Sequence, residues 1–378
     1  MNISLFSFFS GVGMLDLAFE KKGYNIVFVN EFDDQFMDAY KYARKNLCIS
    51  VPVYGYYKKS ALYFAKRRGK RKLVELVQKE REKGNMVGFI GGPPCPDFSK
   101  AGKNRGSEGE HGRLTKTYID IICRCKPDFF VFENVKGLVQ TNKHKVFYEQ
   151  MKYKLMANGF VFSNKLLNAL SYGVPQFRER EIMIGINATR VEMPNTINVV
   201  DNRFEFPWNR YAFADLETIL NKEWPKIQPF VLNSRRKNKY DIYEELTVEY
   251  WFKKNNVSHH PNARDTFKVK KGRTKIEHIA EGDTSRKSFK RLHRWRYSPT
   301  ACYGNNEVHL HPYKARRLSV AEAMAIQSLP KEFVLPDEMT LSSKFKTIGN
   351  GVPYKMSEAI AKTLYEFLKE CKGVDRID

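Results

Sequence analysis

The chain has 378 residues, with 65 lysines and arginines against 42 aspartates and glutamates, so its formal net charge is +23 at pH 7. This excess is typical of proteins that bind polyanions. A hydrophobic content of 42% excludes wholesale disorder, and a mean hydropathy of −0.53 excludes a membrane protein. Six scattered cysteines without a CxxC pair predict no disulfide framework and no structural zinc, so we expect a reducing, cytoplasmic setting.

Short apolar runs bounded by turn residues alternate with helical patterns through the first half of the chain. The apolar runs predict strands, buried on both faces, at residues 3–9, 24–29, 86–90, 128–132 and 181–186. Apolar spacing predicts helices over 114–125 and 146–155. This alternation predicts an α/β domain on a mostly parallel sheet.

The pattern of apolar and polar residues changes after the fifth apolar run. Residues 58–83, between the second and third apolar runs, form a highly charged insertion that we interpret as a solvated helix. From residue 187 to about 318 no helical or strand period persists. That stretch predicts a second, irregular domain, most basic over 263–296, where aromatic residues are interleaved. A capping box then predicts a helix that begins at Ser319, and a last amphipathic helix runs through Ile360 and Leu368.

The first predicted strand ends in a turn that contains Gly11 and Gly13, where backbone N–H groups can face a ligand. The dinucleotide fingerprint requires a third glycine where Asp16 stands, so a nicotinamide dehydrogenase is not indicated. The next strand ends at Glu31, whose carboxylate could accept hydrogen bonds from both ribose hydroxyls of an adenosine. These residues alone leave two interpretations open, a nucleotide-like cofactor and a purely structural turn.

Reactive side chains follow the later strands. Cys95 comes directly after the third run, Glu133 ends the fourth, and Arg178 and Arg180 alternate along the segment that precedes the fifth. The carboxyl ends of parallel strands meet at one edge of a sheet, where open α/β sheets bind ligands. A thiolate nucleophile, an acid and a guanidinium group together predict covalent catalysis by addition to an electron-poor ring.

The ordered motifs FFSGVG, NEFD, GGPPCPDFS, FENV, QFRER, RRLSVAEAMAIQSLP and IGNGVP resemble those of the DNA (cytosine-5) methyltransferase family, of the prokaryotic restriction-modification type. The resemblance implies an S-adenosylmethionine-dependent methyltransferase fold, which is a Rossmann-like α/β fold, with a smaller, irregular target-recognition domain. It implies a catalytic domain over 1–187, a target-recognition domain over 188–340, and a segment over 341–378 that returns to the catalytic domain. The implied activity is methyl transfer from S-adenosylmethionine to C5 of a flipped-out cytosine in a specific double-stranded DNA sequence, through a covalent Cys95–C6 adduct and without a metal.

The resemblance also assigns roles to individual residues. The nucleophile is Cys95, Glu133 contacts N3 and the amino group of cytosine, and Arg178 and Arg180 complete the catalytic set, with Arg180 near O2. The implied cofactor contacts are Phe9, Gly11, Gly13, Glu31, Phe32, Pro94, Leu114, Asn350 and Val352. The implied DNA contacts are Ser99, Lys103 and Arg105, in the loop expected to close over DNA, and Gln176.

The sequence departs from the family pattern at two places, and two rival functions stay open beside this interpretation. Pro96 follows the nucleophile where the family most often has glutamine, and residues 53–57 lack the usual acid, which leaves the contact to the adenine amino group unassigned. The rivals are a tRNA cytosine-5 methyltransferase and a catalytically inactive DNA-binding protein. We expect a monomer in the prokaryotic cytoplasm, at the nucleoid through DNA and with no membrane contact, and a cognate restriction endonuclease as a further partner.

Overall fold

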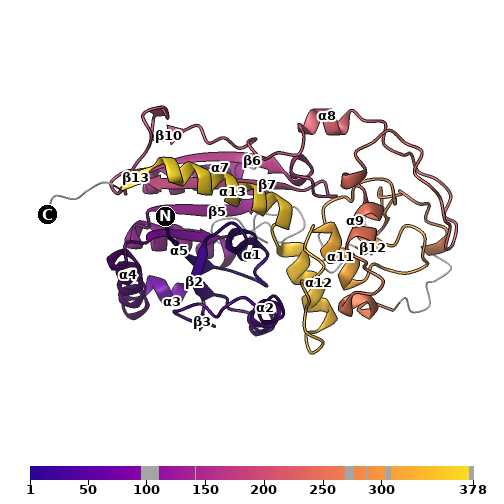
Figure 1. Cartoon of the computed structure of the whole chain (residues 1–378), viewed down its shortest axis with the longest axis horizontal. Helices are drawn as coiled ribbons and strands as arrows, with labels where there is room; N and C mark the ends of the chain where they lie inside the picture. Colours follow the sequence, from indigo (N-terminus) through magenta and orange to yellow (C-terminus); the bar gives the residue numbers. More distant parts are fainter. Residues whose placement is uncertain are drawn as a thin grey trace.

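A computed structural model describes residues 1–94, 110–140, 142–268, 276–286, 288–301, 303 and 308–373. One lobe is built on a nine-stranded sheet in the order β3-β2-β1-β4-β5-β7-β6-β10-β9 (Figure 1). Its strands are β1 (Ile3–Phe8), β2 (Asn25–Asn30), β3 (Tyr56–Tyr57), β4 (Met86–Gly91), β5 (Phe129–Val135), β6 (Phe160–Asn168), β7 (Glu179–Asn187), β9 (Val199–Val200) and β10 (Arg203–Phe204). The five strands from β3 to β5 in this order are mutually parallel.

Helices cover both faces of this sheet because its apolar side chains alternate. Ile3 and Leu5 of β1 join one core cluster, with the last helix, whereas Phe6 and Phe8 join a second cluster on the other face. The helices of this lobe are α1 (Met14–Glu20), α2 (Asp34–Asn46), α3 (Leu62–Ala65), α4 (Arg67–Glu82), α5 (Glu110–Cys125), α6 (Gly137–Gln140), α7 (Asn142–Met156) and α13 (Tyr354–Glu370). The charged insertion over 58–83 is therefore helical, as predicted, and forms α3 and α4.

The predicted strands and helices are present within a few residues of their expected bounds, with one difference in direction. The strand at 181–186 is β7, and it runs antiparallel to β5. It does so because β6, which sequence periodicity did not identify, precedes it and pairs with it as an antiparallel neighbour from Phe160↔Asn187 to Asn168↔Glu179. The sheet is thus mixed on this side, which brings the start of β7 to the same edge as the end of β5.

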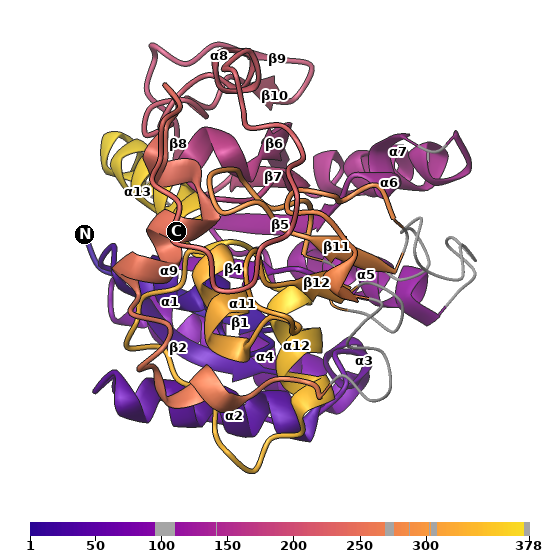
Figure 2. The ribbon, with the colours of Figure 1, turned by 90° about the vertical axis from the view of Figure 1, so that its right-hand side faces the viewer.

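The remaining described residues form a second, irregular lobe, which Figure 2 views from its outer side. Its regular elements are α8 (Leu216–Leu220), α9 (Val248–Lys254), α11 (Val320–Ile326), α12 (Leu341–Asn350), β11 (Phe289–Arg291) and β12 (Val308–Leu310). The capping box at the start of α11 is formed as predicted, between Ser319 and Glu322. The chain then returns to the sheet through α13, which packs against α1 (Figure 1), and β13 (Lys372–Gly373) pairs with β8 (Val191–Glu192).

Candidate active site at the carboxyl edge of the sheet

Glu133 and Arg180 form a buried ion pair where β5 ends and β7 begins. The Nε of Arg180 lies 2.9 Å from Oε1 of Glu133, and their side chains are 12% and 10% exposed. A Cβ added at Gly92 would lie 2.4 Å from Oε2 of Glu133, so glycine allows the carboxylate to approach the turn after β4. Cys95, three residues further on, lies outside the described residues.

The electrostatic surroundings of Glu133 suit a group that exchanges a proton. Burial raises the pKa of Glu133, and the positive charges of Arg180 and Arg178 oppose that rise. A carboxyl with a raised pKa remains protonated to a higher pH than an ordinary glutamate. This is the direction that general-acid chemistry near neutral pH requires.

Arg178 has a different position from its neighbour Arg180. Its side chain is fully buried, and Nη2 donates hydrogen bonds to the carbonyl oxygens of Gly349, at 2.7 Å, and Gly351, at 3.1 Å. Nη1 donates to the carbonyl of Ala301 at 3.4 Å. These contacts join the sheet to two other segments of the chain, and the catalytic contact expected of Arg178 stays a prediction.

Gln176 lies in the interior of the structure, and the DNA contact expected of it stays a prediction. Its side chain has no exposed area, and Oε1 accepts a hydrogen bond from the backbone N–H of Ala301 at 2.8 Å. Nε2 donates to Gln327 at 3.1 Å, and Gln327 in turn donates to the carbonyl of Ile348. The other expected DNA contacts, Ser99, Lys103 and Arg105, lie outside the described residues.

The turn after β1 is joined directly to the turn after β2. Oε2 of Glu31 accepts a hydrogen bond from the backbone N–H of Gly11 at 2.8 Å, and Oε1 accepts from the N–H groups of Phe32 and Asp33. Burial raises the pKa of Glu31, against the effect of these three hydrogen bonds. The Phe32 side chain beside this carboxylate is 72% exposed, although it is large and apolar.

A buried charged network that sequence reasoning did not identify supports this turn. Gly13 has φ +79°, and a Cβ there would lie 2.3 Å from Nη1 of Arg44. Arg44 is 1% exposed, donates to the Gly13 carbonyl and pairs with Glu20 at 3.0 Å. Asp16 accepts hydrogen bonds from Ser7 and Tyr40. These contacts explain why an aspartate stands where a dinucleotide-binding turn would have glycine.

The other predicted cofactor residues lie on several elements around the same edge. Phe9 has φ +53° and its ring meets Tyr118 edge-on, while Leu114 is half-buried in α5. Pro94 is half-buried after β4, and Asn350 is exposed at the end of α12. Val352 differs from these, because its side chain is 6% exposed and packs in the core cluster.

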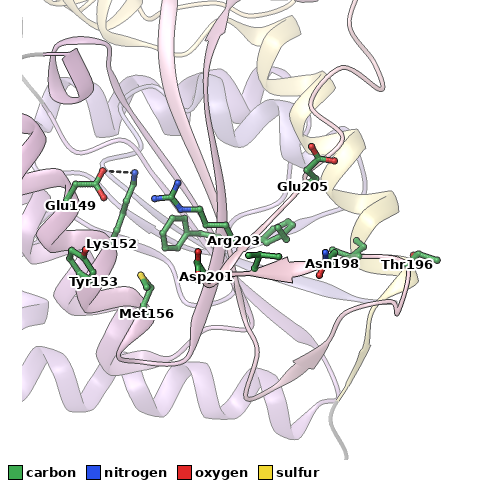
Figure 3. A pocket seen from close by; sticks show the side chains of 13 residues that line it. Glu149, Lys152, Tyr153, Met156, Thr196, Asn198, Asp201, Arg203 and Glu205 are labelled. Atoms are coloured by element: carbon green, nitrogen blue, oxygen red, sulfur yellow. Dashed lines mark hydrogen bonds and ion pairs between the residues drawn. The ribbon is translucent and has the colours of Figure 1, made fainter.

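A large hollow elsewhere on this lobe does not belong to this arrangement. Its volume is about 1070 Å³, and α7 and the β9–β10 hairpin line it, with Lys152 and Glu149 paired on one wall (Figure 3). Phe162, which lines the hollow, pairs with Gly185 of β7, and Gly185 pairs with Phe130 near the start of β5. The hollow therefore lies toward the amino edge, away from Glu133.

Comparison with known proteins decides the family. The family C-5 cytosine-specific DNA methylase matches residues 3–366 of the chain. The chain belongs to this family. It is 52% identical over 369 residues to the Type II methyltransferase M.NmeDI of Neisseria meningitidis serogroup C, covering 97% of this chain and 84% of that protein. It is 29% identical to the Type II methyltransferase M.MthTI of Methanothermobacter thermautotrophicus, covering 99% of both chains.

The fold is also that of a solved relative. A putative DNA modification methyltransferase from an Escherichia coli prophage superimposes with a TM-score of 0.65 at 19% identity, covering 98% of this chain and all of that one. These findings confirm the family, the enzyme class, DNA (cytosine-5) methyltransferase, and the fold predicted from the ordered motifs. Among the described residues no helix is long and apolar enough to cross a membrane, and no cluster of three or more His, Cys, Asp or Glu side chains could hold a metal ion.

Proposed function

We propose that the chain transfers a methyl group from S-adenosylmethionine to C5 of a cytosine flipped out of a specific double-stranded DNA sequence, with Cys95 as the nucleophile. The observation that carries this proposal is the buried Glu133–Arg180 pair, which lies against Gly92 in the turn that leads to Cys95. An acid and a guanidinium group side by side match the ring nitrogen and carbonyl oxygen of a cytosine.

The roles of the residues follow from the chemistry of the base. C5 of cytosine is a poor nucleophile until a thiolate adds to C6, so the Sγ of Cys95 forms the first bond. Glu133 protonates N3 as charge develops there, while Arg180 donates a hydrogen bond to O2. After methyl transfer to C5, the C5 proton leaves to a base, and the electrons of the C5–H bond form the C5–C6 double bond as the C6–S bond breaks. The proton on N3 returns to Glu133, so the aromatic ring, the thiolate and the acid are all restored. A duplex hides C6, so the base must flip out, at a cost of a few kcal/mol.

The residues around Gly11 fit a bound S-adenosylmethionine. Glu31 accepts two backbone hydrogen bonds on Oε1 and one on Oε2, so the carboxylate retains one acceptor position on Oε2 for a ribose hydroxyl. The exposed Phe32 ring offers an apolar face to adenine. When bound, S-adenosylmethionine supplies an electrophilic methyl group.

The wider setting is part of the same proposal. Residues 188–340 act as the target-recognition domain, and the net charge of +23 supports binding to the phosphates of DNA. One active site per flipped base is consistent with a monomer. The similarity to Type II methyltransferases supports a prokaryotic enzyme that acts at the nucleoid, in the cytoplasm, beside a cognate restriction endonuclease.

Removal of the Phe32 ring tests the cofactor site. Phe32→Ala is expected to weaken binding of S-adenosylhomocysteine by about 5- to 150-fold, because stacking of a base on an aromatic ring contributes roughly 1–3 kcal/mol. Isothermal titration calorimetry measures this affinity. The matched control is Val51→Ala, since Val51 is 70% exposed on a neighbouring segment, and its affinity should not change. Equal affinity for wild type and Phe32→Ala would contradict the assigned adenine contact.

The proposed reaction itself is tested by transfer of labelled methyl groups. Unmethylated genomic DNA and bulk tRNA are incubated with S-adenosylmethionine and either the wild-type protein or Cys95→Ser. We expect 5-methylcytosine in DNA with the wild type and none with the variant, because a serine hydroxyl is not ionised at neutral pH. Label in tRNA alone would favour the RNA enzyme, and tight DNA binding without transfer would favour the inactive reader.

A further inference from the structure

A polar hollow of about 480 Å³ lies where the second lobe meets the start of β7. It is lined by Phe177, Gly282, Thr284, Lys290, His293, Arg296, Tyr297, Pro299 and Thr300. Phe177 directly precedes Arg178, and its carbonyl accepts a hydrogen bond from Oγ1 of Thr300 at 2.8 Å. The backbone N–H of Phe177 donates to the carbonyl of Ser298. The hollow is therefore fixed to the edge of the sheet that carries Arg180 and Glu133.

Arg296 is, like Lys290, a cation in the lining of this hollow. Its guanidinium lies over the ring of Tyr297, 5.2 Å from the centroid, and Tyr297 packs edge-on against Trp224 at 5.0 Å. The backbone of Arg296 is also held, because its carbonyl accepts a hydrogen bond from the N–H of Val248. Within the described part of the chain, the guanidinium itself has neither a hydrogen bond nor an ion pair. Arg296 is thus oriented by a ring while its donors remain available.

The lining of the hollow offers donors and no carboxylate. Burial lowers the pKa of His293 to about 4, so its imidazole is neutral at pH 7. Its Nδ1 accepts from the N–H of Trp295 and its Nε2 is bonded to Gln228, which fixes the ring. The hydroxyl of Thr284 adds a donor, whereas the hydroxyl of Thr300 uses its proton on the carbonyl of Phe177. Such a site suits a ligand that presents hydrogen-bond acceptors.

Cations suited to phosphate contacts lie on a different segment of the second lobe. Arg235, Lys237 and Lys239 are exposed, and no ion pair joins them to any other described residue. This loop is fixed at Ser234, whose carbonyl and hydroxyl accept hydrogen bonds from Arg294. Flexible exposed cations suit a DNA backbone, whereas a guanidinium oriented by an aromatic ring suits a base edge.

We infer that Arg296 is a specificity-determining residue that reads the major-groove edge of a guanine, with O6 and N7 accepting hydrogen bonds from its guanidinium. This inference rests on the proposed function, and it adds the residue and the base. Arginine matches O6 and N7 of guanine with two parallel donors, a pattern that no other base pair presents at that position. Arg296→Ala should therefore relax the choice of base at one position of the target without removing catalysis.

The test uses DNA with a cytosine in randomised flanks, methylated by the full-length wild type, Arg296→Ala and Arg296→Lys, and read by bisulfite sequencing. The wild type should require guanine at one position, and Arg296→Ala should lose roughly 5- to 150-fold of that discrimination there. Arg296→Lys keeps the cation but not the paired donors, so it should lose part of the discrimination while its fold and charge are retained. The matched control, Lys237→Ala, should weaken binding to all sequences alike.

A second arm changes the base instead of the protein. Replacing the required guanine by 7-deazaguanine removes N7, so methylation by the wild type should slow while methylation by Arg296→Ala should not slow further. Unchanged base preference in Arg296→Ala, or a uniform loss of affinity with a salt slope reduced by about 0.9, would overturn the inference and mark a phosphate contact. Absence of methyl transfer to any DNA by the wild type would overturn the proposed function first, and this inference with it.

Discussion

Glu133→Gln is expected to lower kcat for methyl transfer by roughly 10²- to 10⁴-fold. Glutamine keeps the shape of the side chain and can still accept from Nε of Arg180, but it has no proton to give to N3 of the cytosine. Single-turnover transfer of labelled methyl to DNA measures the rate. Binding of S-adenosylhomocysteine by the variant should match wild type, because Glu133 lies outside the turn that Gly11 and Glu31 form. A rate within a factor of about three of wild type would rule out the acid role.

The pH dependence of the rate gives a second readout of the same role. Because burial raises the pKa of Glu133, its protonated form persists to higher pH than that of an ordinary glutamate and is lost as pH rises through that pKa. Ionisation of Cys95 works in the opposite direction, so the wild-type rate should rise and then fall with pH. Glu133→Gln should lack the falling limb. An identical profile in both proteins would contradict a titrating Glu133.

Arg178→Met is expected to lower the free energy of unfolding by roughly 3–5 kcal/mol. Methionine fills similar space, but the carbonyls of Ala301, Gly349 and Gly351 lose hydrogen bonds that a fully buried guanidinium provides. Urea denaturation followed by circular dichroism measures the change.

The matched control for Arg178→Met is Arg190→Met. Arg190 pairs with Asp128 at 2.8 Å, with its side chain 24% exposed, so its loss should cost about 1 kcal/mol or less. If both variants unfolded at the same urea concentration, the hydrogen bonds of Arg178 would not stabilise the contact between the sheet and the second lobe. A larger loss for Arg178→Met than for Arg190→Met would show that the buried contacts of Arg178 contribute to stability.

Much of the first lobe could be predicted because its signals are local. Continuous apolar runs fix the strands of a doubly covered sheet, and the Ser319–Glu322 capping box fixes the start of α11. The strand β6 and the antiparallel direction of β7 could not be predicted, since strand direction depends on which strands become neighbours. The second lobe is held by irregular backbone contacts and by buried groups such as Arg294 with Glu281, which leave no periodic pattern in the sequence.

In the candidate site, too, some residues could be predicted from the sequence and others could not. Glu133, Glu31 and Gly11 could be predicted because each directly follows or ends a strand, and the parallel topology brings such positions together. Alternation along an extended segment suggested that Gln176, Arg178 and Arg180 share one surface, but burial of the first two was set by the second lobe packing over them. Arg44 gave no signal either, because a lone arginine in a helix is ordinarily exposed.

The way Arg178 holds the second lobe has a consequence for how target preference can change during evolution. Its hydrogen bonds to Ala301, Gly349 and Gly351 go to main-chain carbonyls, which every amino acid supplies. Substitutions between Asn187 and Ala301 therefore leave these carbonyl acceptors of Arg178 in place. Other contacts do require particular side chains of this stretch, such as the Thr300 hydroxyl on the carbonyl of Phe177, whereas Gln327, the partner of Gln176, lies after it. Under the proposed assignment of residues 188–340 to target recognition, a change of DNA specificity there would leave these anchoring atoms of the catalytic domain unchanged.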